Sequence, residues 1–508
     1  MHERILRGTR ILVLALGAAL AACGGGGGGG GGDDDAEADA GPGDGDTHTV
    51  GGTVTGLYGT VELENNGGDR LTLTESGAFE FTTALEEGAD YDVTIESQAG
   101  AVCSVAQGSG TVGGADVDDV AVTCVELIAF ISTMALDGSD AINDNFTNNV
   151  WVVAPDGSHL APLTELTEVG PGTFGVQWSP DGTRLMFTSI RALSGDDEAG
   201  AVNNVWVMNA DGTALEALTN QTAAGSDCHG VQWSPDGGRI LFRSRRALDG
   251  SDEAGTADNL WVMNADGSDP SPVTENTTAS TGENATWSPD GTRIAYQSSE
   301  ALGAPDTVGS QTNIWVIALD GSVPRATLTH GTVTASYEPV WSPDGSRIAF
   351  TSDRAVNGAD EVNNGSNTNI WVTRPDGTHT RAITALTEAT SLTPSWSADG
   401  ERVVYRSKRT LDGEDASIGA TNIWATDVDG DNAQALTQLT LSNNLNARSS
   451  PDGTLIVYES ARSLDGEDAA NDNLTRNLWM MTAGGDDHTP LTMGTASQAG
   501  SYTPVWVP

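Results

Sequence analysis

The sequence predicts an all-β protein, a seven-bladed β-propeller preceded by a small β-sandwich module. The first observation is a unit that returns every 53 to 57 residues from about residue 127 onward. The second is a pair of marks in these units, Trp-Ser-Pro-Asp-Gly (whole, altered or cut short) and Asn-x-Trp, which together hold all 13 tryptophans. A fixed period of this length is typical of stacked supersecondary units.

Residues 287–329 show why each unit is expected to be a four-stranded sheet. Trp287-Ser-Pro-Asp-Gly291 has the Pro and Gly placement of a type I turn, and residues 293–298 and 314–317 read as strands. A strand before the turn and a short one near Thr329 complete four antiparallel strands. Runs such as Leu260-Trp-Val-Met263 are apolar on successive residues, which indicates sheets covered on both faces. Blades packed radially around an axis satisfy that requirement.

The two ends of the repeat region predict how the ring closes. Residues 127–132 already match a second strand, so the first unit lacks its opening strand. Residues 503–507 supply only an opening strand. Joining them gives seven blades, with the C-terminal strand closing the first blade and removing two exposed sheet edges.

The repeat resembles that of TolB-type propellers, most completely at Trp341 to Phe350 and Val205 to Thr219. The resemblance covers residues 127–508. It implies a propeller fold, and family members bind envelope proteins or precede a hydrolase domain, while some relatives are metal-dependent lyases of acidic sugars. The chain differs from TolB in having seven blades instead of six and in lacking TolB's N-terminal α/β domain. Those differences leave any link to the Tol system open.

The N-terminal segment predicts export and lipidation. Residues 1–22 combine three arginines, a ten-residue apolar run and Leu-Ala-Ala before Cys23, as in a lipoprotein signal peptide; the alternative is an ordinary signal with a chance Cys. Residues 23–47 are then the lipidated Cys and a Gly/Asp-rich flexible tether. An acylated Cys23 anchors the protein to a membrane. We expect the outer membrane, on its periplasmic side or at the cell surface.

Residues 48–126 read as short alternating strands and predict a small, Ig-like β-sandwich. Cys103 and Cys124 fall within it, and export to an oxidising compartment predicts that they form a disulfide. Cys228 is left over, as a buried structural thiol or, alternatively, a reactive one.

The charge balance limits the partners. The formal net charge is −48, and Lys408 is the one lysine of the chain. Nucleic acid is excluded as a partner because no basic patch meets phosphates. We expect a monomer that binds an envelope or extracellular protein and contacts the membrane only through its lipid.

The long loops after the second strand of each blade should share one face with the loops that join blades, and they are strongly acidic. We predict a binding face there. Its carboxylates are Asp196, Asp197, Glu198, Asp249, Asp252, Glu253, Asp412, Glu414, Asp415, Asp465, Glu467 and Asp468. No cofactor is expected except calcium, for which Asp137, Asp140 and Asp144 are weak ligand candidates. The alternative is that these acids only form turns, cap backbone amides or are solvated.

No nucleophile elbow, triad, zinc spacing or phosphate loop occurs, so the sequence predicts that the protein is not an enzyme. The favoured function is a membrane-anchored lipoprotein whose propeller is a protein-interaction scaffold. The alternative is a propeller that binds or degrades polysaccharide, with or without calcium. Few aromatic side chains occur in the long loops, and this favours the scaffold.

Overall fold

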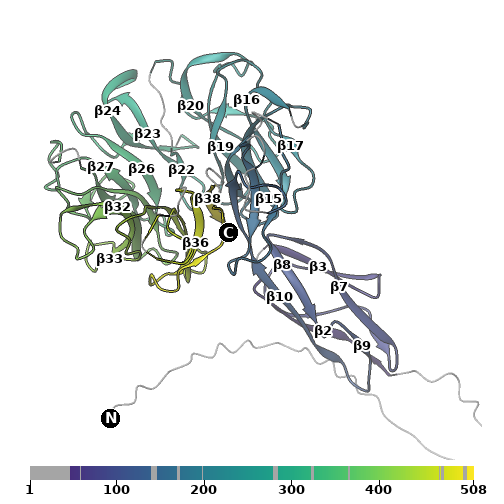
Figure 1. Ribbon diagram of the computed structural model, residues 1–508. Coiled ribbons are helices and arrows are strands. Elements are labelled where there is room, and N and C mark those ends of the chain that lie inside the picture. Colours follow the sequence, from purple (N-terminus) through teal and green to yellow (C-terminus); the bar gives the residue numbers. More distant parts are fainter. Residues whose placement is uncertain are drawn as a thin grey trace, which may run out of the picture. The chain divides into compact units, whose positions relative to one another are not determined.

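In the computed structural model the described residues form strands, turns and loops and no helix, which confirms the all-β prediction (Figure 1). The structure describes residues 46–508 except 58, 139–142, 144–145, 169–171, 197, 279–283, 322–324, 364–366, 468, 471–473 and 496–499. The predicted signal peptide and Cys23 therefore lie outside the described residues.

Residues 47–126 form two four-stranded sheets and a two-stranded one. The strand order of the first sheet is β5 (Gly77–Glu80), β2 (Val50–Thr55), β10 (Val117–Glu126), β8 (Ala101–Ala106). The strand order of the second sheet is β4 (Asp69–Leu73), β3 (Thr60–Asn65), β7 (Asp90–Ala99), β9 (Ser109–Thr111). The third sheet pairs β1 (Thr47–His48) with β6 (Leu85–Glu86). Among the strand pairs that the structure describes in this module, only β2 and β10 are parallel. Val61, Leu63, Phe81 and Val93 belong to one buried apolar cluster of this module.

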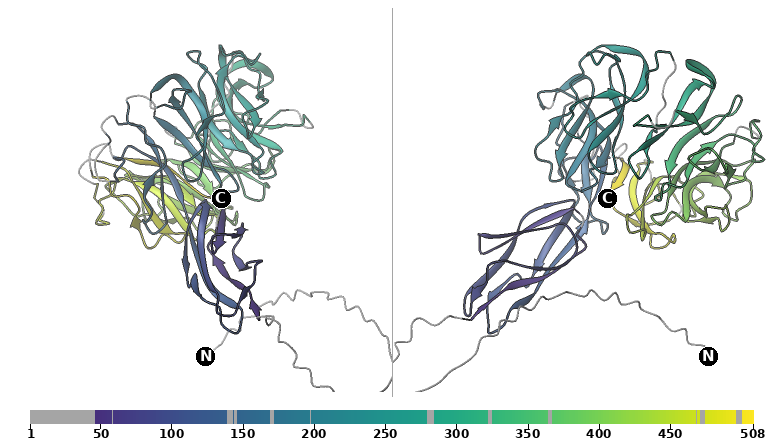
Figure 2. Two further views of the ribbon diagram at one scale, coloured as in Figure 1. Left: turned by 90° about the vertical axis from the view of Figure 1, so that its right-hand side faces the viewer. Right: turned by 180° about the vertical axis from the view of Figure 1, so that it is seen from behind.

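The described residues from 128 onward form seven four-stranded antiparallel sheets (Figure 2). In strand order they are β38 (Ser501–Trp506), β11 (Ile128–Ser132), β12 (Asn149–Val153), β13 (Ala161–Pro162); β14 (Thr173–Trp178), β15 (Arg184–Arg191), β16 (Ala199–Asn209), β17 (Glu216–Ala217); β18 (Cys228–Trp233), β19 (Arg239–Arg246), β20 (Ala254–Asn264), β21 (Ser271–Pro272); β22 (Thr286–Trp287), β23 (Arg293–Ala301), β24 (Ala304–Ala318), β25 (Ala326–Thr327); β26 (Ser336–Trp341), β27 (Ile348–Ser352), β28 (Asn369–Thr373), β29 (Arg381–Ala382); β30 (Ser391–Trp396), β31 (Arg402–Arg409), β32 (Ser417–Asp427), β33 (Gln434–Ala435); and β34 (Asn444–Ser449), β35 (Leu455–Ser460), β36 (Asn477–Thr482), β37 (Thr489–Pro490).

The C-terminal strand completes the first of these sheets, as the sequence predicted. In β38, Trp506 pairs with Ile128 of β11 and Ser501 pairs with Ser132. First strands also contact first strands of neighbouring sheets, for example β14 with β18 and β38, and β30 with β26 and β34. The first strands therefore line the axis of the ring.

The tryptophans of both marks lie in the cores between sheets, and all 13 are buried. Arginines at the start of second strands stack on the tryptophan of the next sheet. The guanidinium carbon of Arg184 is 4.8 Å from the ring centre of Trp233, and that of Arg293 is 4.8 Å from the ring centre of Trp341. The period seen in the sequence is thus also a period of contacts between sheets.

A buried side-chain clamp recurs in every sheet and explains the Asn of Asn-x-Trp. In the fifth sheet, Asn369 Oδ1 accepts from the Thr384 hydroxyl (2.8 Å) and the Leu386 amide (2.8 Å), while its Nδ2 donates to the Leu386 carbonyl (2.8 Å). Thr384 Oγ1 accepts from the Ile370 amide (2.9 Å). The other Asn–Thr pairs are Asn149–Thr164, Asn204–Thr219, Asn259–Thr274, Asn313–Thr329, Asn422–Thr437 and Asn477–Thr492. The clamp fixes the third strand to the start of the loop that leads to the next sheet.

We predict that Asn369→Ala lowers the free energy of unfolding by about 2–4 kcal/mol, because it leaves several buried polar groups without partners. Urea denaturation followed by circular dichroism measures the change. The matched control is Asn264→Ala at an exposed Asn, with an expected loss of about 0.5 kcal/mol or less. Equal losses in the two variants would show that the clamp contributes nothing beyond an ordinary surface hydrogen bond.

The predicted disulfide joins Cys103 of β8 to Cys124 of β10, which are opposite each other in the sheet register. On the chain-entropy model, a cross-link over a separation of 21 residues stabilises the fold by about 3 kcal/mol.

We therefore expect Cys103→Ser combined with Cys124→Ser to lower the stability of the sandwich module by about 3 kcal/mol. Differential scanning calorimetry should show the transition of the module moving down by more than the propeller transition, since the buried clusters of the two are distinct and only Val102 and Val125 of the module pack against the first propeller cluster among the described residues. A thermogram that does not change on removing both sulfurs contradicts this prediction.

Candidate functional site

The antiparallel order of each sheet places two sets of loops at one end of the propeller. We call this end the loop face; it comprises the connections from second to third strands and the connections between sheets. The opposite end, the turn face, carries the Ser-Pro-Asp-Gly turns and the turns between third and fourth strands. The long, acidic loops of the sequence all belong to the loop face.

Three of the acidic loop residues hold the neighbouring loop in place. Asp252 accepts hydrogen bonds from the Thr222 amide (2.8 Å) and the Ala223 amide (3.0 Å) of the preceding inter-sheet connection. Asp360 and Asp415 occupy the same place in their loops and accept from the amides of the connections at residues 332–333 and 387–389. The hydrogen bond from the Thr222 hydroxyl lowers the pKa of Asp252. These carboxylates are therefore ionised at neutral pH and fix the neighbouring inter-sheet connections through hydrogen bonds.

Other predicted carboxylates close their own loops. Asp249 accepts from the Ser251 amide (2.9 Å), Asp412 from the Glu414 amide (3.1 Å) and Asp465 from the Glu467 amide (3.0 Å). Each side chain thus closes an Asx-type turn. Glu198, Glu253, Glu414, Glu467 and Asp196 are exposed at the rim of the loop face. Asp197 and Asp468 lie outside the described residues.

An arginine at the end of the second strand supports these loops from below. In the third sheet the Arg246 guanidinium lies 5.0 Å from the ring centre of Trp261, and its Nη2 donates to the Gly250 carbonyl (2.7 Å). Arg191, Arg409 and Arg462 make the same two contacts in their sheets. The long loops therefore rest on buried tryptophans through a cation–π contact and a charged hydrogen bond.

The described residues contain no group of three or more His, Cys, Asp or Glu side chains that could hold a metal ion. Of the weak calcium candidates, Asp137 is described, and Asp140 and Asp144 lie outside the described part of the chain. Calcium binding by the loops remains a prediction.

First strands carry a bulge near the axis, where one residue has a left-handed backbone. Glu338 (φ 55), Thr393 (φ 50) and Thr503 (φ 51) occupy this position, which is strained for β-branched residues. The Thr393 amide donates to Glu338 (2.9 Å), and the Thr503 amide donates to Glu459 (2.8 Å). The half-buried Glu338 and the buried Glu459 thus each connect two adjacent sheets near the axis.

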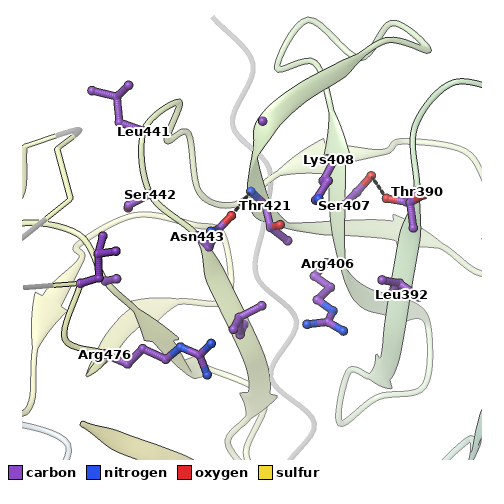
Figure 3. A pocket seen from close by; sticks show the side chains of 14 residues that line it. Thr390, Leu392, Arg406, Ser407, Lys408, Thr421, Leu441, Ser442, Asn443 and Arg476 are labelled. Atoms are coloured by element: carbon purple, nitrogen blue, oxygen red, sulfur yellow. Dashed lines mark hydrogen bonds between the residues drawn. The ribbon is translucent and has the colours of Figure 1, made fainter. Parts of the chain in front are cut away.

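A cavity of about 610 Å³ opens on the loop face between the sixth and seventh sheets (Figure 3). Arg406 and Lys408 from β31 line one side of it, and Arg476, which precedes β36, lines the other. Leu392 and Leu445 add apolar wall, and Leu441 and Leu474 add exposed apolar side chains. The volume is that of a small-ligand site.

Sequence reasoning missed this cavity and expected an acidic face throughout. One signal existed: the basic run Arg406-Ser-Lys-Arg409 stands out in a chain of net charge −48. The third sheet has the related run Arg243-Ser-Arg-Arg246, so the run alone does not identify the cavity. Arg476 is remote in sequence and joins the cavity only in the folded ring.

Cys228 is fully buried and is the one free cysteine among the described residues. Burial raises the pKa of its thiol to about 11, and the sulfur donates to the Thr219 hydroxyl of the clamp (3.7 Å). The structural interpretation of Cys228 therefore fits its surroundings.

No helix in the described residues has the length and hydropathy needed to cross a membrane.

No family model matches the chain. A Bacillus subtilis (strain 168) protein named uncharacterized peptidase YuxL is 36% identical over 120 residues, which are 23% of this chain and 16% of that protein. The chain thus matches well under two thirds of the length of this curated relative.

Solved structures similar to the chain include putative TolB from Agrobacterium tumefaciens. Its TM-score is 0.38 and its identity 21%, covering 62% of this chain and 88% of that one. An oligogalacturonate lyase in complex with manganese has a TM-score of 0.46 and 17% identity, covering 73% and 86%. A prolyl endopeptidase has a TM-score of 0.49 and 12% identity, covering 68% and 46%.

These comparisons overturn one prediction. The sequence was expected to belong to a protein that is not an enzyme, and that prediction is wrong: the curated relative that the chain matches is named a peptidase. The prediction rested on the absence of familiar catalytic motifs, and such an absence does not exclude similarity to an enzyme.

The Ser-Pro-Asp-Gly turns make a pH-dependent contribution. The Ser342 hydroxyl donates to Asp344 (2.5 Å), and this bond, with others from Ser346, lowers the pKa of Asp344 to about 2. A carboxylate whose pKa is lower in the folded than in the unfolded state stabilises the fold above about pH 4, and the gain is lost as the pH falls toward 2.

We predict that Ser342→Ala costs about 1 kcal/mol at pH 7 and less as the pH falls from 4 to 2. Urea unfolding of both proteins across that range gives the difference, in which the effect of overall charge cancels. A difference that stays constant down to pH 2 would exclude the Ser342–Asp344 bond as its source.

Proposed function

We propose that the protein is an exported, membrane-anchored lipoprotein whose propeller binds a polypeptide through its loop face. One observation carries this proposal. Every exposed large apolar side chain of the described residues belongs to the loop face, and the turn face has none. They are Phe146, Phe174, Leu193, Val308, Val333, Val356, Val362, Leu441, Leu474 and Met493.

The distribution supports a protein partner because apolar side chains gathered on one face lose contact with water on association. Val308 is 64% exposed, Leu441 68% and Met493 65%. Glu198, Glu253, Glu414 and Glu467 are exposed in the loops of the same face. Apolar contacts with a polar rim are the usual anatomy of a protein interface. The bonds from Asp252, Asp360 and Asp415 restrain three of the inter-sheet connections on this face, which reduces the entropy cost of binding there.

The name of the curated relative, a peptidase, fits a polypeptide ligand better than a polysaccharide. Export, lipidation at Cys23 and an outer-membrane location belong to the same proposal and rest on residues 1–47. They favour a partner in the envelope or outside the cell. The proposal concerns binding, and cleavage of the bound polypeptide is a separate readout.

The test uses the full chain in detergent with a photo-crosslinking amino acid at Val308, Val333 or Met493. We expect one protein from envelope or secreted fractions to be crosslinked from these positions. The matched positions Thr292 and Glu401, exposed on the turn face, should give no crosslink. Replacing Val308, Val333 and Met493 together by Ser should weaken capture at least about fivefold through lost apolar burial.

Crosslinking from the turn face alone, or capture of glycan without protein, would contradict the proposal. Intact-mass analysis of the captured polypeptide, before and after incubation with the protein, shows whether it is also cleaved.

A further inference from the structure

We propose that the cavity between the sixth and seventh sheets binds the C-terminal residue of a polypeptide, with its carboxylate on Arg406 and Lys408 and an apolar side chain against the leucines. The inference rests on the proposed function in taking the ligand to be a polypeptide, and it adds a site and a chemical class. The shared chemistry of possible ligands is an oxyanion on an apolar body.

Three cations line the cavity, and two of them have no carboxylate partner among the described residues. Among the described residues, neither Arg406 nor Lys408 forms an ion pair, and Arg406 Nε is buried without a hydrogen-bond partner. Arg476, in contrast, lies 3.7 Å from Glu459 and stacks on the Tyr502 ring at 5.8 Å. The chain has a net charge of −48, yet these two neighbouring cations have no carboxylate partner in the described part of the chain. Their charges are therefore available to bind an anionic ligand.

The cavity also has an apolar wall. Leu392 and Leu445 are half-buried on the cavity side of β30 and β34, and Leu441 and Leu474 are 68% and 69% exposed at its mouth. Leu474 also has a left-handed backbone (φ 54), which is unfavourable for a bulky residue. A small inorganic anion would leave this wall uncovered, whereas an apolar residue with a free carboxylate would occupy both parts of the cavity.

The walls are fixed before any ligand arrives. The Thr421 amide donates to Asn443 Oδ1 (2.9 Å), and the Ser407 hydroxyl donates to the Thr390 carbonyl (3.0 Å), as Figure 3 shows. These bonds hold the inter-sheet connection and the ends of β31 and β32 in place around the cavity. A site with fixed walls loses little conformational entropy when a ligand binds.

Lys408 supplies a direct assay because it is the one lysine of the chain. Acetylation by an N-hydroxysuccinimide ester, followed by mass spectrometry of the Lys408 peptide, measures the occupancy of the cavity. We expect N-acetyl-alanyl-leucine to slow acetylation of Lys408 at least about fivefold at saturation, because an ion-paired amine is a poorer nucleophile. The neutral N-acetyl-alanyl-leucinamide should give no protection.

Arg406→Gln should weaken binding of the free acid about tenfold, the loss of one charge-assisted hydrogen bond. Arg243→Gln is the matched control: Arg243 of β19 is paired with Leu260 as Arg406 of β31 is paired with Ile423, and Arg243 does not line the cavity. Arg406→Lys, which keeps the charge, should recover part of the affinity if Arg406→Gln folds poorly.

Protection by the free acid and not by the amide supports the assignment. Protection by neither, or equally by both, overturns it. Protection by inorganic phosphate or galacturonate without protection by the peptide acid also overturns it and identifies another oxyanion. Crosslinking through Val308, Val333 and Met493, which are outside the cavity, tests the proposed function separately. Retained crosslinking without protection of Lys408 would therefore overturn the cavity assignment alone.

Discussion

The buried clamp between Asn and Thr is the interaction on which the rest of the propeller depends. Asn369 uses its amide to satisfy a carbonyl, a backbone amide and a hydroxyl at once, and the same arrangement returns in every sheet. Removing such an amide would leave polar groups buried without partners, which costs far more than the net gain from making one hydrogen bond. Since the clamp lies where the fourth strand leaves for the next sheet, it also sets where each inter-sheet connection begins, and so the geometry of the loop face.

The acidic residues of the long loops have two roles: some bind backbone amides of the protein, and others are exposed to solvent. Asp252, Asp360 and Asp415 direct their oxygens at backbone amides of the neighbouring connection, while glutamates beside them remain in water. The first group gives the face its shape and the second its charge. The basic cavity between the sixth and seventh sheets interrupts that charge at one place, so the loop face is not electrostatically uniform around the ring.

Most of the fold could be predicted from the sequence, because the same strand pattern recurs in each repeated unit. The two ends of the repeat region also showed which strand was missing from the first unit. The Cys103–Cys124 disulfide was also predictable, since both residues fall in one small module. The site was much less accessible. The partners of Asp252 are about 30 residues away in another sheet, and Arg476 reaches Arg406 only because neighbouring sheets stand side by side. Side chains brought together across a sheet boundary leave no short-range spacing to recognise. The exposed apolar residues share no motif at all.

The pairing of β38 with β11 has a consequence for the rate at which the ring forms and opens. Ile128 and Trp506 stand almost a whole propeller apart in the chain, so this contact has the longest loop to close and is expected to form late. Contacts that form after the folding barrier mainly slow unfolding. The pairing of β38 with β11 is thus expected to lower the rate at which the ring unfolds. The clamps within each sheet contribute to its equilibrium stability.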